Sequence, residues 1–152
     1  MKTESRLEEL GIVLPDPPVP VASYVAYKMV GNLLFISGQG PMVAGKPQYV
    51  GTVGKEVSFD DAHAAARLCG LNLIALMKKA LGDLDRVEEI IHLKGFVACV
   101  DDFEDQPKII DGASGLMIEV FGDAGTHTRC AVGTNSLPLR IPTEIEAIVK
   151  FH

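Results

Sequence analysis

EIEAIV, residues 144–149, alternates between apolar and charged side chains, as a half-buried β-strand does. One side of this strand carries Ile145, Ala147 and Val149, and the other carries two glutamates. HTRCAVG, residues 127–133, is interpreted as the strand that pairs with it. We therefore expect the rest of the chain to be arranged around this strand pair.

Arg129 lies in the predicted partner strand between small or apolar neighbours. Its guanidinium group is expected to project from a mostly apolar surface. There, the planar group can bind a carboxylate through two hydrogen bonds. The alternative is that Arg129 pairs structurally with Glu144 or Glu146. The spacing thus indicates either a small-anion site or an ion pair between strands.

Turn residues divide the first part of the chain. Residues 24–30 and 33–37 predict two strands joined by Gly31-Asn32, a dipeptide typical of tight hairpins. SGQGP, residues 37–41, predicts a turn whose glycines let the backbone approach a ligand closely.

The middle of the chain predicts two helices separated by a strand. Ser58, with Asp61 three residues later, starts a helix that ends before Gly82. Residues 87–100 predict a strand with apolar residues on both faces. Aspartates near residue 105 are expected to cap a second helix whose apolar residues recur to residue 121.

The resulting order, β-β-α-β-α-β, predicts an α+β fold in which two helices cover one face of a largely antiparallel sheet. The other face then remains bare. Phe96, Val100 and Ile148 are expected to lie on it, and symmetric association is the simplest way to cover them.

Composition limits the domain count and the partners. With 152 residues, of which 47% are apolar, the chain can form one core, which we assign to residues 23–152; residues 1–22 predict a short amphipathic helix and a proline-rich arm. The net charge of −6 argues against nucleic acid and anionic membranes as partners. Because no signal peptide or membrane span is evident and three cysteines cannot all pair, we expect a cytoplasmic protein with reduced thiols.

Four short blocks resemble one family. Arg129, Leu137-Pro138 eight positions after it and the Glu-Ile-Glu-Ala that begins fifteen positions after it are similar to the C-terminal signature of the RidA/YjgF/UK114 family, often labelled endoribonuclease L-PSP. Ser23-Tyr24-Val25 and Ile36-Ser37-Gly38-Gln39 resemble its N-terminal blocks, in the same order. The resemblance implies a chorismate-mutase-like fold and a homotrimer, with three sheets around a central barrel and a ligand cleft at each subunit seam.

The resemblance also implies a chemistry that needs no cofactor. Arg129 would bind the carboxylate of a reactive 2-imino acid, and Glu144 would hold or activate the attacking water. Tyr24, Ser37 and Gly38 match positions that line the cleft. Without the resemblance, Ser37 would be interpreted as a satisfied hydroxyl at a strand end and Tyr24 as an interface aromatic.

The chain departs from the family pattern at two places. Ala131 stands where the family commonly has cysteine, whereas Cys130 is expected to point to the opposite side of the strand. His127 stands where proline is usual, so it either enters the cleft as a titratable group or lies at a loop edge. The histidines lack metal-ligand spacing, and no metal is implied.

Three functions therefore stay open. The first is hydrolytic deamination of 2-imino or enamine acids to 2-oxo acids and ammonia. The second is a regulatory module that binds a small carboxylate without turnover, which Ala131 and His127 favour. The third is the endoribonuclease activity of the family label, against which the acidic charge argues.

Overall fold

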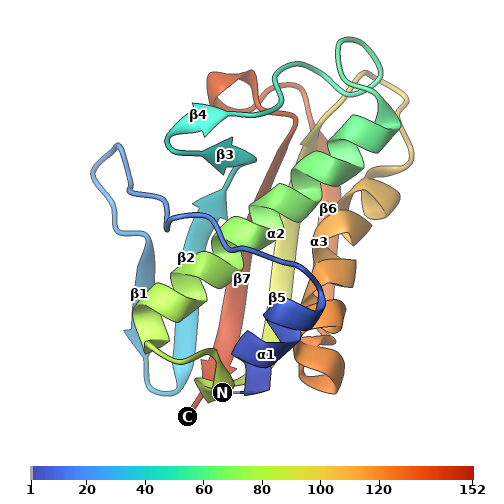
Figure 1. The fold of residues 1–152 in the computed structure, drawn as a ribbon. Coiled ribbons are helices and arrows are strands. Elements are labelled where there is room, and N and C mark those ends of the chain that lie inside the picture. The colour runs from blue at the N-terminus through green and yellow to red at the C-terminus, as the bar shows by residue number, and fades with distance from the viewer. Residues whose placement is uncertain (1) are drawn as a thin grey trace.

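The computed structural model describes residues 2–152, and Figure 1 shows them as one sheet with helices on one side. The sheet has the strand order β1-β2-β7-β5-β6. Its strands are β1 Tyr27–Val30, β2 Leu33–Gln39, β5 Val87–Ala98, β6 Thr128–Thr134 and β7 Thr143–Phe151. The helices α2 Phe59–Leu81 and α3 Gln106–Phe121 cross one face. The predicted α+β fold is confirmed.

Short elements complete the chain. A small separate hairpin, which the sequence interpretation missed, is formed by β3 Met42–Val43 and β4 Lys46–Pro47. Within residues 2–152, three 3-10 turns lie between larger elements: η1 Leu84–Arg86, η2 Gly122–Gly125 and η3 Pro138–Arg140.

The first hairpin forms where it was predicted, but its first strand is shorter. Val30 pairs with Leu33, and Gly31 between them has a φ of +59°, a conformation that glycine adopts without strain. Strand β1 begins at Tyr27 rather than at Tyr24, because the chain before it folds back and the Tyr24 N–H donates to the carbonyl of Ala22 at 2.9 Å.

The predicted turn at residues 37–41 is wrong. Strand β2 continues to Gln39, and its register against β7 shifts between Ile36 and Gln39, which is a bulge and not a reversal of the chain. Just beyond, the side-chain amide of the buried Asn72 in α2 donates to the carbonyl of Gly40 at 3.0 Å. The glycines therefore mark an irregular strand end that is held against a helix.

Strands β6 and β7 are not neighbours, contrary to the prediction. Strand β5 lies between them, antiparallel to β7 and parallel to β6. The chain passes from β5 through α3 to β6, and a helical crossover of this kind joins parallel strands. Strand β6 is consequently an edge strand, and in the sheet register Leu93 of β5 lies between Arg129 and Ala147.

Both large helices begin close to the predicted places. The Ser58 side chain accepts a hydrogen bond of 3.1 Å from the Asp61 N–H, and Gly82, with a φ of +79°, ends α2. Asp105 precedes α3, but its side chain makes no capping hydrogen bond and pairs with Lys108 at 3.5 Å. The prediction that aspartates cap this helix is thus wrong in its detail.

The core lies between the helices and one face of the sheet. Ile145, Ala147 and Val149 of β7 are all buried there, as their alternation predicts. The opposite face carries apolar side chains in the open: Phe35 is 41% and Val132 is 40% exposed. The predicted bare sheet face is therefore present, with Phe96 and Ile148 on it. Val100 was placed there wrongly, because β5 ends at Ala98 and Val100 lies against Gly54 in the loop region.

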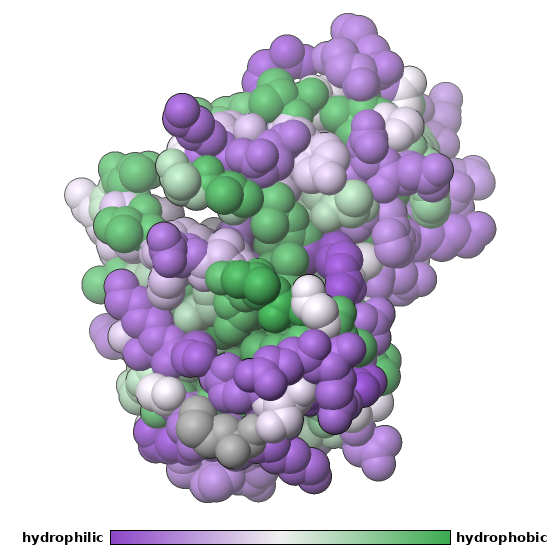
Figure 2. Space-filling model, viewed as in Figure 1, coloured by the Kyte–Doolittle hydropathy of each residue, from purple (hydrophilic) through white to green (hydrophobic). Residues whose placement is uncertain are grey.

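Helix α1, Lys2–Glu9, packs at the end of the molecule near α3 and η1. Its Leu7 is buried, and the Asp85 carboxylate accepts hydrogen bonds of 2.8 Å from the N–H groups of Lys2 and Thr3. The arm that follows crosses α2, and the apolar colour gathers near this crossing at the centre of Figure 2. Among residues 2–152, no helix is long and apolar enough to span a membrane.

Helices α2 and α3 pack so closely at Gly112 that a side chain there has no room. A Cβ on Gly112 would lie 2.2 Å from the carbonyl oxygen of His63. We expect Gly112→Ala to destabilise the fold by about 1–3 kcal/mol, the usual cost of overpacking, as measured by denaturant unfolding.

Gly115 provides the matched control. It lies in the same helix, and a Cβ there meets nothing within 4 Å. Gly115→Ala is expected to stabilise the fold by up to about 1 kcal/mol through helix propensity. Equal destabilisation by both variants would show that the close approach of the helices is not the cause.

Candidate functional site

Arg129 points to the helix-covered side of the sheet, at the exposed edge formed by β6. Its Nη1 lies 2.7 Å from Oδ1 of Asp111 and donates at 3.2 Å to Oγ of Ser114, and both partners belong to α3. The Arg129 side chain is only 23% exposed. The structural alternative from the sequence, a pair with Glu144 or Glu146, is wrong, because Asp111 is the partner.

Both contacts use the same guanidinium nitrogen. Within residues 2–152, no hydrogen bond or ion pair engages Nε or Nη2 of Arg129. The edge formed by these two nitrogens is the one that binds a carboxylate through two parallel hydrogen bonds. Arg129 is thus held in place while that edge stays free for an anion.

His127 lies beside this arginine, in the loop immediately before β6, so the loop-edge alternative describes its position. Its Nε2 is 2.8 Å from Oγ of Ser114, and its Nδ1 is 2.6 Å from the carbonyl oxygen of Gly125 in η2. Ser114, itself only 9% exposed, therefore contacts both His127 and Arg129. The polar cluster beside α3 thus consists of four linked groups: the Gly125 carbonyl, His127, Ser114 and Arg129.

Glu144 occupies a different surface. It lies opposite Phe96 in the sheet register, on the open face, and packs against the bulge of β2. A Cβ on Gly38 would come within 3.1 Å of Oε2 of Glu144, so the glycine makes room for the carboxyl group. In the described part of the chain, no hydrogen bond to this carboxyl group is formed, and it can still accept one from water.

The electrostatics of Glu144 suit a proton acceptor. Burial raises the pKa of Glu144 above its ordinary value, and the negative charge of Glu146 raises it further. A carboxylate with a raised pKa binds a proton more readily than a solvated one, which is the property that a general base requires.

Ser37 lies on the same side of the sheet as Glu144, but its hydroxyl group has a different partner. The hydroxyl of Ser37 donates to the carbonyl of Val25 at 2.7 Å, which corresponds to the satisfied strand-end hydroxyl of the alternative interpretation. Tyr24 is 51% exposed and precedes β1. Ser37 also lines a hollow of about 360 Å³ together with Phe35 and Ile148.

The structure therefore divides the predicted site residues into two groups. Arg129, His127 and Ala131 lie on the helix side at β6, whereas Glu144 and Gly38 lie on the open face at β7 and β2. Strand β5 and the thickness of the sheet separate the groups. One chain alone does not bring Arg129 and Glu144 to the same molecule of ligand.

Comparison with known proteins places this chain in a family. The family model described as "YjgF/chorismate_mutase-like, putative endoribonuclease" matches residues 4–145, nearly the whole chain. The chain belongs to this family. Protein TCP17 of Trypanosoma cruzi is 38% identical over 152 residues, which cover 99% of this chain and 95% of that protein.

Two solved structures of similar proteins illustrate the range of the resemblance. Atu1372 of Agrobacterium tumefaciens, described as of unknown function, is 45% identical with a TM-score of 0.90, covering 99% of this chain and 92% of that one. TdcF of E. coli, described with bound serine, is 25% identical with a TM-score of 0.67, covering 90% and 94%.

Compared with the YjgF family signature, the β6 strand shows the departure expected from its sequence. Ala131 shares the helix side with Arg129 and packs against the core, whereas Cys130 pairs with Lys94 on the open face. All three cysteines are unpaired, and burial raises the pKa of the Cys69 thiol to about 12. Ala131, which stands where the resemblance implied a cysteine, therefore brings no reactive atom.

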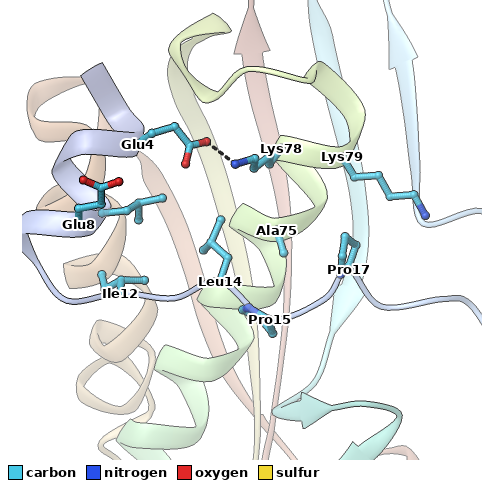
Figure 3. A pocket seen from close by; sticks show the side chains of 10 residues that line it. Glu4, Glu8, Ile12, Leu14, Pro15, Pro17, Ala75, Lys78 and Lys79 are labelled. Atoms are coloured by element: carbon cyan, nitrogen blue, oxygen red, sulfur yellow. Dashed lines mark ion pairs between the residues drawn. The ribbon is translucent and has the colours of Figure 1, made fainter. Parts of the chain in front are cut away.

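The larger hollows of this YjgF family member lie elsewhere. One of about 640 Å³ opens where the N-terminal arm crosses α2, and Figure 3 shows Leu14, Pro15 and Pro17 facing Ala75 and the Glu4–Lys78 ion pair. Neither Arg129 nor Glu144 lines this hollow. Among the described residues, no cluster of histidine, cysteine or carboxylate side chains could hold a metal ion.

Sequence interpretation missed Asp111 and Ser114, the partners of Arg129. A signal for Ser114 existed, because it interrupts the apolar stripe of α3 four residues after Ile110 and three before Met117. A polar residue at a core position of a helix requires a partner. Which partner it meets depends on the β5-α3-β6 crossover, and that was not predicted.

Proposed function

We propose that this protein hydrolyses 2-imino acids, or their enamine tautomers, to 2-oxo acids and ammonia without a cofactor. The observation that carries the proposal is Arg129, which is half-buried and fixed through Nη1 while its Nε and Nη2 edge stays free. This geometry suits a small carboxylate. The serine bound in the related TdcF structure supports a small amino-acid-like ligand.

The chemistry needs little beyond positioning. Water adds to the electrophilic imine carbon while Glu144 accepts one of its protons and passes it to the nitrogen, which gives a carbinolamine. The carbinolamine hydroxyl group then gives up its proton, again through Glu144, to the amino nitrogen as the C–N bond breaks, and the 2-oxo acid and ammonia leave. The proposal assigns the water to Glu144 because its carboxyl group has a raised pKa and no hydrogen-bond partner within residues 2–152. Substrate carboxylate and attacking water are thus handled by separate residues.

The proposed site forms between copies of the chain. Since Arg129 and Glu144 lie on opposite faces of one sheet, they can act on one substrate only if they come from different subunits. The bare apolar face and the unpaired edge of β6 both favour association. We propose a homotrimer, as the family resemblance implies.

The assembly has a direct test. At micromolar concentration, light scattering after gel filtration is expected to give three times the chain mass of 16.3 kDa. A mass near 16.3 kDa would remove the site between subunits altogether.

The activity is tested with imines made in place. An amino-acid oxidase generates 2-imino acids from several amino acids, semicarbazide traps those that persist, and ammonia release is followed in parallel. The wild-type protein is expected to lower the trapped fraction and accelerate ammonia release. Rates no faster than buffer with every side chain would contradict the proposal.

A second candidate is a module that binds a small carboxylate without turnover. Two observations favour it: Ala131 replaces the usual cysteine, and Asp111 already pairs with Arg129. It predicts carboxylate binding in calorimetry with no effect on imine lifetime. The endoribonuclease label of the family is the third candidate, and salt-sensitive RNA binding would support it.

A further inference from the structure

The hydrogen bonds around His127 have only one possible direction in the neutral ring. The Gly125 carbonyl can only accept, so Nδ1, 2.6 Å away, must carry the ring hydrogen. Nε2 is then an acceptor, and the hydroxyl of Ser114, 2.8 Å away, must donate to it. The Ser114 oxygen in turn accepts from Nη1 of Arg129 at 3.2 Å.

This chain of hydrogen bonds connects the free edge of Arg129 to an imidazole. Ser114 is nine-tenths buried, so its hydroxyl group has little access to water. If His127 gains a proton, Nε2 becomes a donor, and the Ser114 oxygen must accept from two cationic groups at once. The Ser114 hydrogen must then turn away from Nε2, and a second positive charge lies one hydroxyl group away from the guanidinium.

A carboxylate at Arg129 would reduce this repulsion. The charged groups linked to His127 are Arg129 from β6 and, beyond it, Asp111 from α3. From η2, the carbonyl of Gly125 contacts the ring, and the carboxylate of Asp123 is exposed and makes no hydrogen bond to it. Asp111 contacts Nη1 through a single oxygen and is 58% exposed, so it neutralises the cluster only in part. An incoming anion therefore favours the protonated ring, and by linkage the protonated ring favours the anion.

We propose that Ser114 and His127 are positioning residues for Arg129, which fix the guanidinium edge that faces the ligand and couple carboxylate binding to proton uptake at His127. This inference rests on the proposed function in one respect, the role of Arg129 as carboxylate anchor. It adds a dependence on pH that the anchor alone does not have.

The test is calorimetric titration of the intact protein with 2-oxobutyrate between pH 5.5 and 8, in two buffers of different ionisation enthalpy. The wild-type protein is expected to take up protons on binding and to bind roughly 3–10-fold more tightly at pH 5.5 than at pH 8. His127→Gln should bind without this uptake. His63→Gln, an exposed histidine of α2, is the matched control and should keep it.

Serine variants separate positioning from packing. Ser114→Ala removes the hydrogen-bonded link, and we expect weaker binding with a smaller dependence on pH in this range. Ser114→Thr keeps the hydroxyl group and should restore part of the binding strength and part of its dependence on pH. If proton uptake on binding persists unchanged in His127→Gln, the proton is taken up by Glu144 or Asp111, and the inference is overturned.

A measurement without ligand gives an independent check. Long-range ¹H–¹⁵N spectra, recorded at a pH where the His127 ring is neutral, are expected to show His127 in the Nδ1–H tautomer. The Nε2–H tautomer would leave Nδ1 without a hydrogen for the Gly125 carbonyl and would overturn the inference even if the protein binds carboxylates. No binding of 2-oxobutyrate to the wild-type protein would refute the anchor itself, whereas binding without proton uptake would refute only the coupling.

Discussion

Glu144→Gln is expected to lower the rate of 2-imino acid hydrolysis by about 10²–10⁴-fold while carboxylate binding and fold are preserved. Glutamine keeps the shape of the side chain that packs on Gly38 but cannot take a proton from water. In the wild-type protein, turnover should fall as the pH drops through the pKa of Glu144, at a pH above the ordinary glutamate value of 4.5. Equal rates in wild type and variant would dismiss this role of Glu144.

Glu146→Gln is the control on the same face of the same strand. It removes a negative neighbour that raises the pKa of Glu144 but leaves the carboxyl group itself in place. Turnover should persist, and the acid limb of the pH–rate profile should move to lower pH. A large loss of rate would instead place the chemistry at Glu146.

Arg129→Lys is expected to weaken carboxylate binding by about 1.5–3 kcal/mol, the range for hydrogen bonds to charged groups. Lysine keeps the positive charge but lacks the planar guanidinium group, so the pair of parallel hydrogen bonds to the carboxylate is lost. Calorimetry with 2-oxobutyrate measures the effect on binding, and the imine assay measures it on turnover.

Arg67→Lys is the matched control for that substitution. Arg67 lies on α2 and pairs with Glu119 at 3.6 Å, and both side chains are partly exposed. The same chemical change there should leave binding unchanged. If Arg129→Lys also binds 2-oxobutyrate and hydrolyses imines like the wild type, Arg129 has only a structural role, in its ion pair with Asp111.

Local signals predicted most of the fold. The Ser58 cap, the Gly82 helix end and the hairpin at Gly31 all depend on neighbours in sequence, and all form as predicted. The glycines at residues 38 and 40 misled the interpretation, because the same residue type serves turns and bulges. The pairing of Gln39 with Ile145 of β7 and the contact of Asn72 with Gly40 distinguish the two, and both join residues that are far apart in the sequence.

The site was less accessible from sequence for a topological reason. Alternation correctly separates Ile145 from Glu144, but it does not say which strand lies next to β7. The interpretation paired β6 with β7 and so offered Glu144 as a partner of Arg129. The crossover through α3 places β5 between the two strands and gives Arg129 a partner, Asp111, from the helix itself.

Subunit complementation tests the central claim most directly, namely that one site uses Arg129 of one chain and Glu144 of another. Arg129→Met and Glu144→Gln are each expected to be nearly inactive. Trimers assembled from an equal mixture, by joint refolding or co-expression with two tags, should recover about one quarter of the wild-type imine hydrolysis, because one seam in four pairs an intact arginine with an intact glutamate. Activity no greater than that of the separate variants would contradict a site shared between subunits.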